Sequence, residues 1–414
     1  MSVIEYRKLK SGLRIVAEEM PYVRSISLGI WINVGSRMED KSNYGIAHFI
    51  EHMLFKGTEN RTSRQISNDI DYYGGNINAF TTEDHTCYHV KMPSNRIDRG
   101  IDVLADMINN SRFDEEDIEK EKSVIIEEIK MYQDSPEDYL YDELLMKTFD
   151  NKGVGRNVLG SKKSVSEINR EKIVDFFEKY YVPNNSVIVI SGNFVLDDIM
   201  EKIENGFKNW KEKELILKRE SQKFKPVRFI EDKDDEQVNL AIIFECPDDT
   251  IEKEFYTVKL IGNILGNTPS SRLFQHIREE RGLSYSVYSS DSFYVGYGEF
   301  GIFSSMASEN LKEVYDAIIY EIENLKKNYI TDEELTFAKE QYKGMVIMNL
   351  EDTEDRMMLI GEYEVENRRL KNIEDVIKCV DSIDLEYIKK IIDRIFNGEM
   401  SVGITGKSVK TIMK

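Results

Sequence analysis

The stretch SISLGIWINVG, residues 25–35, decides the fold class of this chain. Its apolar residues alternate with others, so that Ile26, Leu28 and Ile30 face one way and the residues between them face the other way. This period of two predicts a strand with one buried face. Helical periodicity follows at residues 46–56, so a mixture of strands and helices is expected.

Regular elements are predicted on both sides of this strand. Further strands are expected at 3–9, 13–17, 76–81, 86–92 and 186–191, and helices at 46–56, 63–73, 97–108 and 114–131. Pro136 should end or kink the last of these helices, because proline disfavours α geometry in the residue before it. These elements predict an α+β fold.

A weak internal repeat indicates a duplication. Residues 114–140 align with residues 331–357 at an offset of 217, and SVIVISGN at 186–193 matches SVGITGK at 401–407. A chain of 414 residues also exceeds the roughly 250–300 residues that one hydrophobic core usually serves. We therefore predict two similar domains, each with a mainly antiparallel sheet packed by helices.

The predicted domain boundaries follow the distribution of charge. Residues 211–236 are mostly charged and fit a linker. This leaves residues 1–210 as the first domain and residues 237–414 as the second.

The overall charge excludes two classes of partner. Lys and Arg number 56 against 76 Asp and Glu, which gives a net charge of −20. This balance argues against nucleic acid and against an anionic membrane surface, since both attract basic proteins.

Three scattered cysteines without a CxxC pair exclude a disulfide framework. There is no long apolar run and no leader-like N-terminus, so the expected compartment is the cytoplasm.

The clearest chemistry lies in GIAHFIEHM, residues 45–53. His48 and His52 are four residues apart on a predicted helix, so both imidazoles share one face and can reach one divalent ion. Glu51 leans toward the same face and can take a proton from a metal-bound water without being a ligand. This is the HxxEH pattern of the inverzincins. A third ligand must come from elsewhere in the chain.

The helix predicted at 114–131 offers that ligand. Glu121 and Glu128 are seven residues apart, nearly two turns, so both point the same way. Two acids on one partly apolar stripe cost free energy unless a cation compensates them, and zinc would do so. The other histidine pair, His85 and His89, lies on or next to a strand, where four residues separate the rings too far for one ion. We interpret that pair as structural.

With these residues in place, the chain resembles a known family. The segments that carry the likeness are GIAHFIEHMLFKGT (45–58), GGNINAFTTEDHTCY (74–88), EKEKSVIIEEI (119–129) and REERGLSYSVYS (278–289). They are similar to the pitrilysin, insulysin and mitochondrial processing peptidase family of zinc metallopeptidases, and most to its short-chain processing-peptidase branch. The likeness falls in both halves and implies two domains that close like a clamshell around a peptide.

The resemblance implies a zinc ion and assigns its ligands. The family's third ligand lies 76 positions after the second histidine, which here is Glu128, with Glu127 as the neighbouring alternative. A supporting acid seven residues earlier matches Glu121. The implied zinc site is therefore His48, His52 and Glu128, with Glu51 as the general base.

The second domain is implied to complete the active site. An Arg-x6-Tyr pair of the family matches Arg278 and Tyr285. The arginine would bind a substrate carbonyl, and the tyrosine would donate a hydrogen bond toward the tetrahedral oxygen. Near the positions that correspond to the zinc motif, the second half has Leu265, Thr268 and Pro269, so it is expected to bind no metal.

The resemblance also implies how a peptide binds. Asn78 and Ala79 match contact positions on an edge strand to which an extended peptide adds by backbone pairing. Phe55 matches a position beside the residue after the cut. Asp138 and Asp142 match acids that receive an arginine before the cut, which implies a preference for basic peptides. The alternative for this acid pair is a solvated acidic face.

The predicted function is that of a zinc endopeptidase acting on unfolded peptides or N-terminal extensions, with a homodimer as the expected assembly. A non-catalytic peptide-binding or scaffold subunit of the same fold is the main alternative. Inactive subunits of the family lack part of the residue set described above, so its completeness favours the enzyme. A peptidase devoted to peptide clearance is a second alternative, which the sequence does not separate from a processing role.

Overall fold

The structure is a computed structural model that describes residues 4–215, 217, 219, 222–366, 368 and 372–413. The chain forms two compact units. Among the described residues, none of the helices combines the length and the apolar character needed to cross a membrane.

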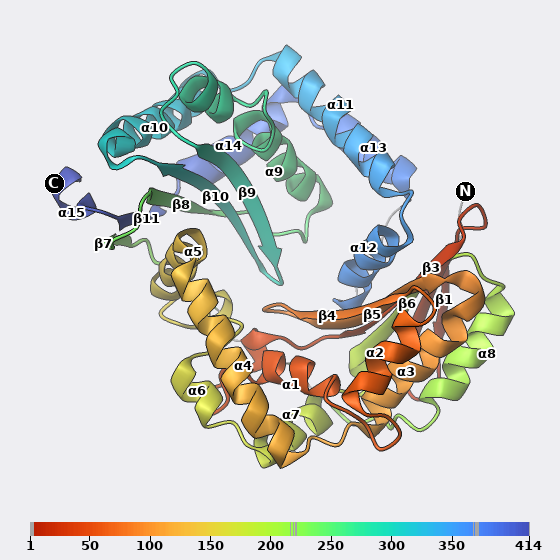
Figure 1. Ribbon diagram of the computed structural model, residues 1–414. Coiled ribbons are helices and arrows are strands. Elements are labelled where there is room, and N and C mark those ends of the chain that lie inside the picture. The colour runs from red at the N-terminus through yellow and green to blue at the C-terminus, as the bar shows by residue number, and fades with distance from the viewer. Residues whose placement is uncertain are drawn as a thin grey trace. The chain divides into compact units, whose positions relative to one another are not determined.

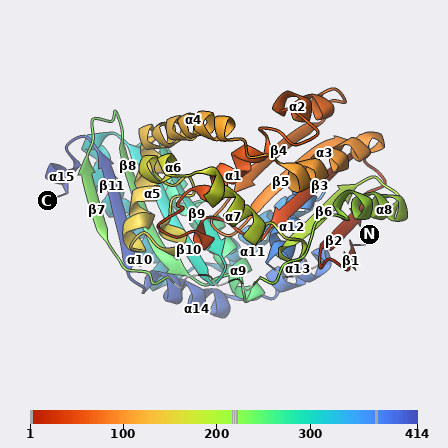
Figure 2. The ribbon, with the colours of Figure 1, turned by 90° about the horizontal axis from the view of Figure 1, so that it is seen from below.

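The first unit is built on a six-stranded sheet. Its strands are β1 (Ile4–Lys8), β2 (Arg14–Glu19), β3 (Ser25–Ile32), β4 (Asn76–Thr81), β5 (Thr86–Pro93) and β6 (Ser186–Gly192). Their order in space is β1-β2-β6-β3-β5-β4, as Figure 2 shows. Only β2 and β6 are parallel neighbours, and the other pairs are antiparallel. β4 therefore forms an edge of the sheet.

Helices cover one face of this sheet and bury a large apolar core with it (Figure 1). They are α1 (Ile46–Leu54), α2 (Ser63–Asp71), α3 (Ile97–Asn110), α4 (Glu115–Asp134), α6 (Lys162–Ser166), α7 (Arg170–Tyr180) and α8 (Leu196–Phe207). Ile26 and Ile30 from β3 are fully buried in this core together with Phe49 of α1 and Leu104 of α3. Burial of each such side chain contributes about 1.5–3 kcal/mol.

The second unit has a five-stranded sheet of related topology. Its strands are β7 (Arg228–Asp232), β8 (Val238–Cys246), β9 (Ser286–Tyr294), β10 (Tyr297–Met306) and β11 (Met400–Gly406). The order β7-β11-β8-β10-β9, with β7 and β11 parallel, repeats the order β2-β6-β3-β5-β4 of the first sheet. The duplication that the sequence repeat predicts is therefore present in the strand topology.

The core of the second unit lies between this sheet and a layer of helices. They are α9 (Glu252–Leu265), α10 (Leu311–Asn328), α11 (Asp332–Asn349), α13 (Ile373–Asp381), α14 (Leu385–Phe396) and α15 (Val409–Ile412). Phe244 and Phe300 both meet the ring of Phe396 edge-on inside this core. A π-helical segment, Phe274–Glu279, precedes β9.

One helix of each unit comes from the other half of the sequence. α5 (Pro136–Thr148) belongs to the second unit, where Leu140 packs with the sheet. α12 (Thr353–Val365) belongs to the first unit, where Met357 packs with Trp31. The starts of the two helices are related by the 217-residue offset of the repeat. A single division of the chain near residue 210 does not reproduce these units, because each helix covers the sheet of the other half.

Two expectations about single segments are corrected by the structure. β3 is buried on both faces, whereas the alternating pattern predicts one buried face. The reason is α12, which covers the face that carries Trp31. Within the predicted linker at 211–236, residues Arg228–Asp232 form strand β7, which pairs with β11. The break predicted at Pro136 is present, since α4 ends at Asp134 and α5 begins at Pro136.

Candidate metal centre and active site

Helix α1 presents the two histidines of the HxxEH pattern, and its start is fixed by neighbouring residues. Gly45 precedes the helix with a φ of 85°, a left-handed conformation that favours glycine. The carboxylate of Glu39 accepts hydrogen bonds from the backbone amides of Gly45 (2.8 Å) and Ala47 (2.9 Å). A carboxylate at a helix N-terminus satisfies amides that have no partner inside the helix. Glu39 therefore anchors the helix that carries the histidines.

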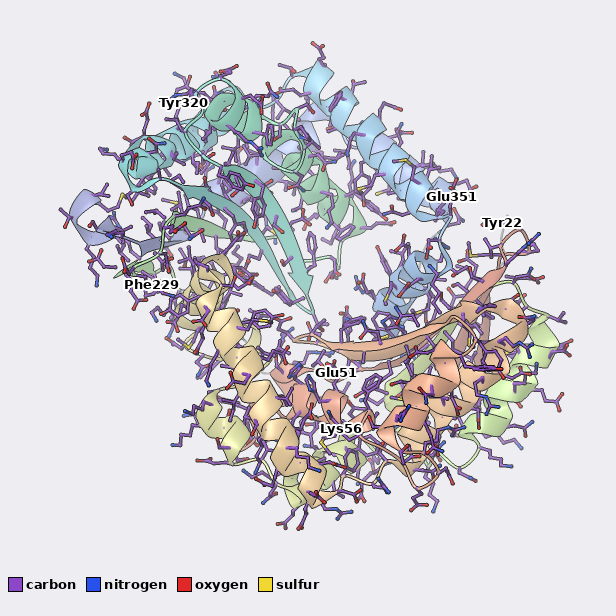
Figure 3. The ribbon with its side chains drawn as sticks, viewed as in Figure 1. Tyr22, Glu51, Lys56, Phe229, Tyr320 and Glu351 are labelled. Atoms are coloured by element: carbon purple, nitrogen blue, oxygen red, sulfur yellow. The ribbon has the colours of Figure 1, made fainter. Side chains whose placement is uncertain are left out.

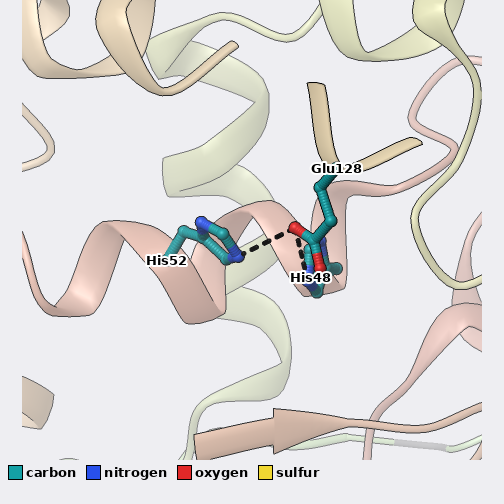
Figure 4. A group of neighbouring side chains, drawn as sticks. All are labelled: His48, His52 and Glu128. Carbon is teal, nitrogen blue, oxygen red and sulfur yellow. Dashed lines mark ion pairs between the residues drawn. The ribbon is translucent and has the colours of Figure 1, made fainter. Parts of the chain in front are cut away.

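His48, His52 and Glu128 converge on one point (Figure 4). One donor atom from each lies within 4.8 Å of the other two. Oε2 of Glu128 is 3.8 Å from Nε2 of His48 and 3.6 Å from Nε2 of His52. Ligand atoms of a tetrahedral zinc ion bound at about 2.0–2.1 Å lie about 3.3 Å apart. Both distances to Glu128 are therefore within about half an ångström of the spacing in a zinc site, and the three donor atoms are grouped closely enough to be candidate ligands of one ion.

The protonation state of His48 also suits a metal ligand. Burial, and then the neighbouring His52, lower the pKa of His48 to about 3. A neutral imidazole keeps the lone pair that a metal ligand needs. Nδ1 of His48 is buried and has no hydrogen-bond partner among the described residues.

His52 is oriented by a carboxylate on α4. Its Nδ1 lies 2.8 Å from Oε1 of Glu121, whose side chain is buried. Burial lowers the pKa of His52, but the hydrogen bond and charge of Glu121 together with the charges of Glu51 and Glu128 raise it above its usual value. A hydrogen bond at Nδ1 leaves Nε2 to face Glu128, as a metal ligand requires.

Glu51 lies next to this group, between α1 and the end of β4 (Figure 3). The hydroxyl of Thr81 donates a hydrogen bond of 2.6 Å to Oε2 of Glu51. Burial raises the pKa of Glu51, against the hydrogen bond from Thr81. A half-buried carboxyl with a raised pKa is suited to exchange protons near neutral pH.

The two candidate acids on α4, Glu127 and Glu128, point in different directions. Glu127 points away from the histidines, with 71% of its side chain exposed, and pairs with Lys130 at 2.6 Å. Glu128 points toward them. Among the residues that the structure describes, no other group of three such side chains comes together to hold a metal.

Arg278 and Tyr285 lie near each other in the second unit. The Arg278 guanidinium is 4.8 Å from the ring centroid of Phe274 and 6.0 Å from that of Tyr285. The side chain of Tyr285 is 74% exposed. Arg278 is exposed as well, so both groups are accessible for contact with a ligand.

The expected peptide-contact residues of the first unit lie on or beside its exposed edge. Asn78 and Ala79 lie on the edge strand β4, where Asn78 is exposed and Ala79 is half-buried. Phe55 directly follows α1, and its ring is 6.5 Å from that of the buried Tyr88. The free side of β4 can pair with an added strand.

The acid pair lies on α5 in the second unit. Asp138 is exposed and Asp142 is half-buried. Burial and the nearby charge of Asp138 raise the pKa of Asp142 to about 7. Two carboxylates that share one helix face in this way favour a cationic partner.

Three residues around this site were not predicted from the sequence. Thr81 and Glu39 act through contacts between elements, and neither has a local signal. Lys56 contacts Glu121, and its position four residues after His52 is the only sequence signal for it. His89 lies 3.3 Å from Glu354 of α12 and takes no part in the candidate metal site.

Comparisons with known proteins cover nearly the whole chain. The insulinase model of peptidase family M16 matches residues 14–162, and the peptidase M16 inactive domain matches residues 167–342. A Bacillus subtilis protein named "Uncharacterized zinc protease YmxG" is 35% identical over 96% of this chain and 97% of its own length. A Mycobacterium leprae protein named as an uncharacterized zinc protease is 32% identical over 96% of this chain and 90% of its own length.

A solved structure agrees with the fold. The crystal structure of a protease from Helicobacter pylori is similar with a TM-score of 0.91 and 22% identity, over 98% of this chain and 99% of that one. At this identity the likeness concerns the fold. Two family models together span most of the sequence, and relatives above 30% identity align over nearly all of it. This chain therefore belongs to peptidase family M16, the insulinase family.

Proposed function

We propose that this protein is a zinc-dependent endopeptidase that cleaves unfolded peptides or N-terminal extensions of proteins. The observation that carries the proposal is the convergence of His48, His52 and Glu128 beside Glu51. Two relatives of this chain are named as uncharacterized zinc proteases, which supports the proposal. Membership of a peptidase family supports peptide as the substrate class.

His48, His52 and Glu128 would hold a zinc ion, which when bound would lower the pKa of a water to about 7 and polarise the scissile carbonyl. Glu51 takes the proton of the attacking water and delivers it to the leaving amine. Oε2 of Glu51 is held by Thr81, so Oε1 is the atom available for this transfer. Glu121 keeps the Nε2 atom of His52 directed at the metal position.

Residues of the second unit act on the same peptide in this proposal. The Arg278 guanidinium binds a substrate carbonyl, and the Tyr285 hydroxyl donates a hydrogen bond to the oxygen that becomes negative in the transition state. The exposure of Tyr285 supports this role, since the hydroxyl of a core tyrosine would not reach a ligand.

The peptide binds as an added strand on β4, with Asn78 and Ala79 as backbone contacts and Phe55 beside the residue after the cut. Asp138 and Asp142 favour a basic residue before the cut. The raised pKa of Asp142 supports this preference, because a cationic side chain would relieve the repulsion between the two acids.

The alternative is a peptide-binding or scaffold subunit without activity. The presence of His48, His52, Glu128 and Glu51 in one compact group favours the enzyme. A role in peptide clearance would use the same chemistry, and a survey of cleaved substrates would separate it from processing.

The proposal is tested by the metal content and activity of a single variant. The wild-type protein should bind about one zinc per chain and cleave a fluorogenic basic peptide until a chelator is added. Glu51→Gln should keep the zinc and lose the cleavage. An active Glu51→Gln variant would remove Glu51 from its assigned role, and a wild-type protein that retains no zinc would contradict the function itself.

A further inference from the structure

We propose that Lys56 is a positioning residue for the zinc ligand His52 and acts through Glu121. This inference rests on the proposed zinc function and adds to it a residue that is neither a metal ligand nor a general base. Lys56 lies just beyond the end of α1, in the same unit as the candidate metal centre (Figure 3).

The contacts form a chain of three groups. Nζ of Lys56 lies 2.5 Å from Oε2 of Glu121, and Nδ1 of His52 lies 2.8 Å from Oε1 of the same carboxylate. The two oxygens of Glu121 are thus bound one each by two side chains four residues apart. The carboxylate is therefore held at two points and cannot rotate without losing one contact.

The burial of Glu121 explains why the second contact is needed. Its side chain is 4% exposed, and a buried carboxylate is costly unless it is both hydrogen-bonded and paired with a charge. Lys56 places a positive charge beside one oxygen of this carboxylate, and Nδ1 of His52 makes a hydrogen bond with the other oxygen.

The backbone around Lys56 fixes its position. Gly57 has a φ of 135°, a conformation that favours glycine, and an added Cβ there would meet atoms of Arg61 and Arg112. The turn continues with a hydrogen bond from the Thr58 amide to the Arg61 carbonyl. The turn thus follows Lys56 directly, and the lysine side chain reaches the same carboxylate as His52.

The pair of Lys120 and Glu116, also on α4, differs from that of Lys56 and Glu121 in its exposure to solvent. Lys120 and Glu116 have 64% and 83% of their side chains exposed, and such surface pairs contribute about 0–1 kcal/mol. The Lys56 side chain is 33% exposed and that of Glu121 is 4% exposed. Lys120 therefore provides a matched control, since it is the residue next to Glu121 in sequence and carries the same charge.

The effect of Lys56 on zinc binding should involve His52 and not His48. Nδ1 of His48 is buried without a hydrogen-bond partner among the described residues. Of the two imidazoles, only His52 is seen to be oriented by a carboxylate. A Glu121 side chain that is held less firmly should therefore disturb the orientation of His52 and leave His48 in place.

The test measures zinc affinity without substrate, by competition with a chromogenic chelator. Groups that orient metal-bound histidines typically change metal affinity by about 10–100-fold. We expect Lys56→Met to weaken zinc binding about tenfold, Glu121→Gln to weaken it at least as much, and Lys56→Arg to stay close to wild type. Lys120→Met should equal wild type. Lys56→Gln, which keeps a polar side chain without the charge, replaces Lys56→Met if the latter does not fold.

The double variant decides whether Lys56 acts through Glu121. In the Glu121→Gln background, Lys56→Met should cause little further loss, because coupled residues are not additive. The inference is overturned if Lys56→Met binds zinc as wild type does, or if its full effect persists beside Glu121→Gln. A wild-type chain without zinc affinity would instead overturn the proposed function, so the two failures are distinguishable.

Discussion

The hydroxyl of Thr81, the last residue of edge strand β4, donates a 2.6 Å hydrogen bond to Glu51 on helix α1. The strand proposed to pair with the peptide therefore also holds the group proposed to move the proton. Ala79, two residues earlier on the same strand, is one of the proposed backbone contacts. Binding and proton transfer are thus linked through one strand, which leads to the first prediction.

Replacement of Thr81 by valine should lower kcat about tenfold and leave KM nearly unchanged. Valine keeps the shape of the side chain but removes the donor, so Glu51 loses the contact that directs its free oxygen. Thr81→Ser, which keeps the hydroxyl, should restore most of the rate. Steady-state kinetics with one fluorogenic peptide would show this, and an unchanged kcat with an altered KM would assign Thr81 to binding only.

Tyr285→Phe should lower kcat by about 10²–10³-fold, the usual cost of losing one hydrogen bond to a transition-state oxygen. Zinc content should not change. Tyr320 is also exposed, at 60%, and lies in the same unit, so Tyr320→Phe is the control and should be fully active. Equal rates for the two variants would show that the Tyr285 hydroxyl takes no part in the reaction.

Asp142→Asn should change both stability and substrate preference. Because the pKa of Asp142 is raised from 3.8 to about 7, its contribution to stability is present below pH 4 and is lost as the pH rises through 7. At pH 8 the asparagine variant should therefore be more stable than wild type by about 1–2 kcal/mol, a value that allows for its partial exposure. At pH 4 the two should be equal.

Urea unfolding at the two pH values measures this difference, with the exposed Glu201→Gln as a control that should follow wild type at both. If the acid pair receives a basic residue, Asp142→Asn should also reduce the preference for arginine over a neutral residue before the cut. Equal stability of the variant and wild type at pH 8 would show that Asp142 is well solvated. An unchanged preference for arginine in the variant would show that another group selects the substrate.

Arg356→Met should destabilise the first unit by about 3–5 kcal/mol. Arg356 of α12 donates two hydrogen bonds of 2.7 Å to Glu18, and both residues are buried. Removal of one partner of a buried ion pair is strongly destabilising. Arg7→Met, which breaks an exposed pair with Asp197, should cost less than about 1 kcal/mol. Denaturant unfolding compares the two, and similar losses would mean that α12 is not held by this ion pair.

Local patterns were sufficient for much of the fold. The alternation in β3, the i, i+4 histidines of α1 and the break at Pro136 are all short-range signals, and the confirmed α+β class follows from them. The offset of 217 predicted the duplication, which the matching strand orders of the two sheets display. Periodicity reports such features because neighbouring residues on one element share a face.

Contacts between distant segments were not predictable in this way. The pattern of β3 places Trp31 on its polar face, yet Trp31 is fully buried because α12, more than 300 residues later, covers it. The contacts of Lys56 with Glu121 and of Thr81 with Glu51 likewise join separate elements. No single window of sequence contains both partners, so such contacts require the fold itself.

The most direct test of the metal centre compares two neighbouring acids on α4. Glu128 lies 3.6–3.8 Å from the histidine Nε2 atoms, whereas Glu127 is largely exposed and pairs with Lys130. Zinc content should be measured by elemental analysis for Glu127→Gln and Glu128→Gln purified side by side. The account predicts about one zinc per chain in the first variant and little or none in the second. Full zinc in Glu128→Gln, or its loss in Glu127→Gln alone, would contradict it.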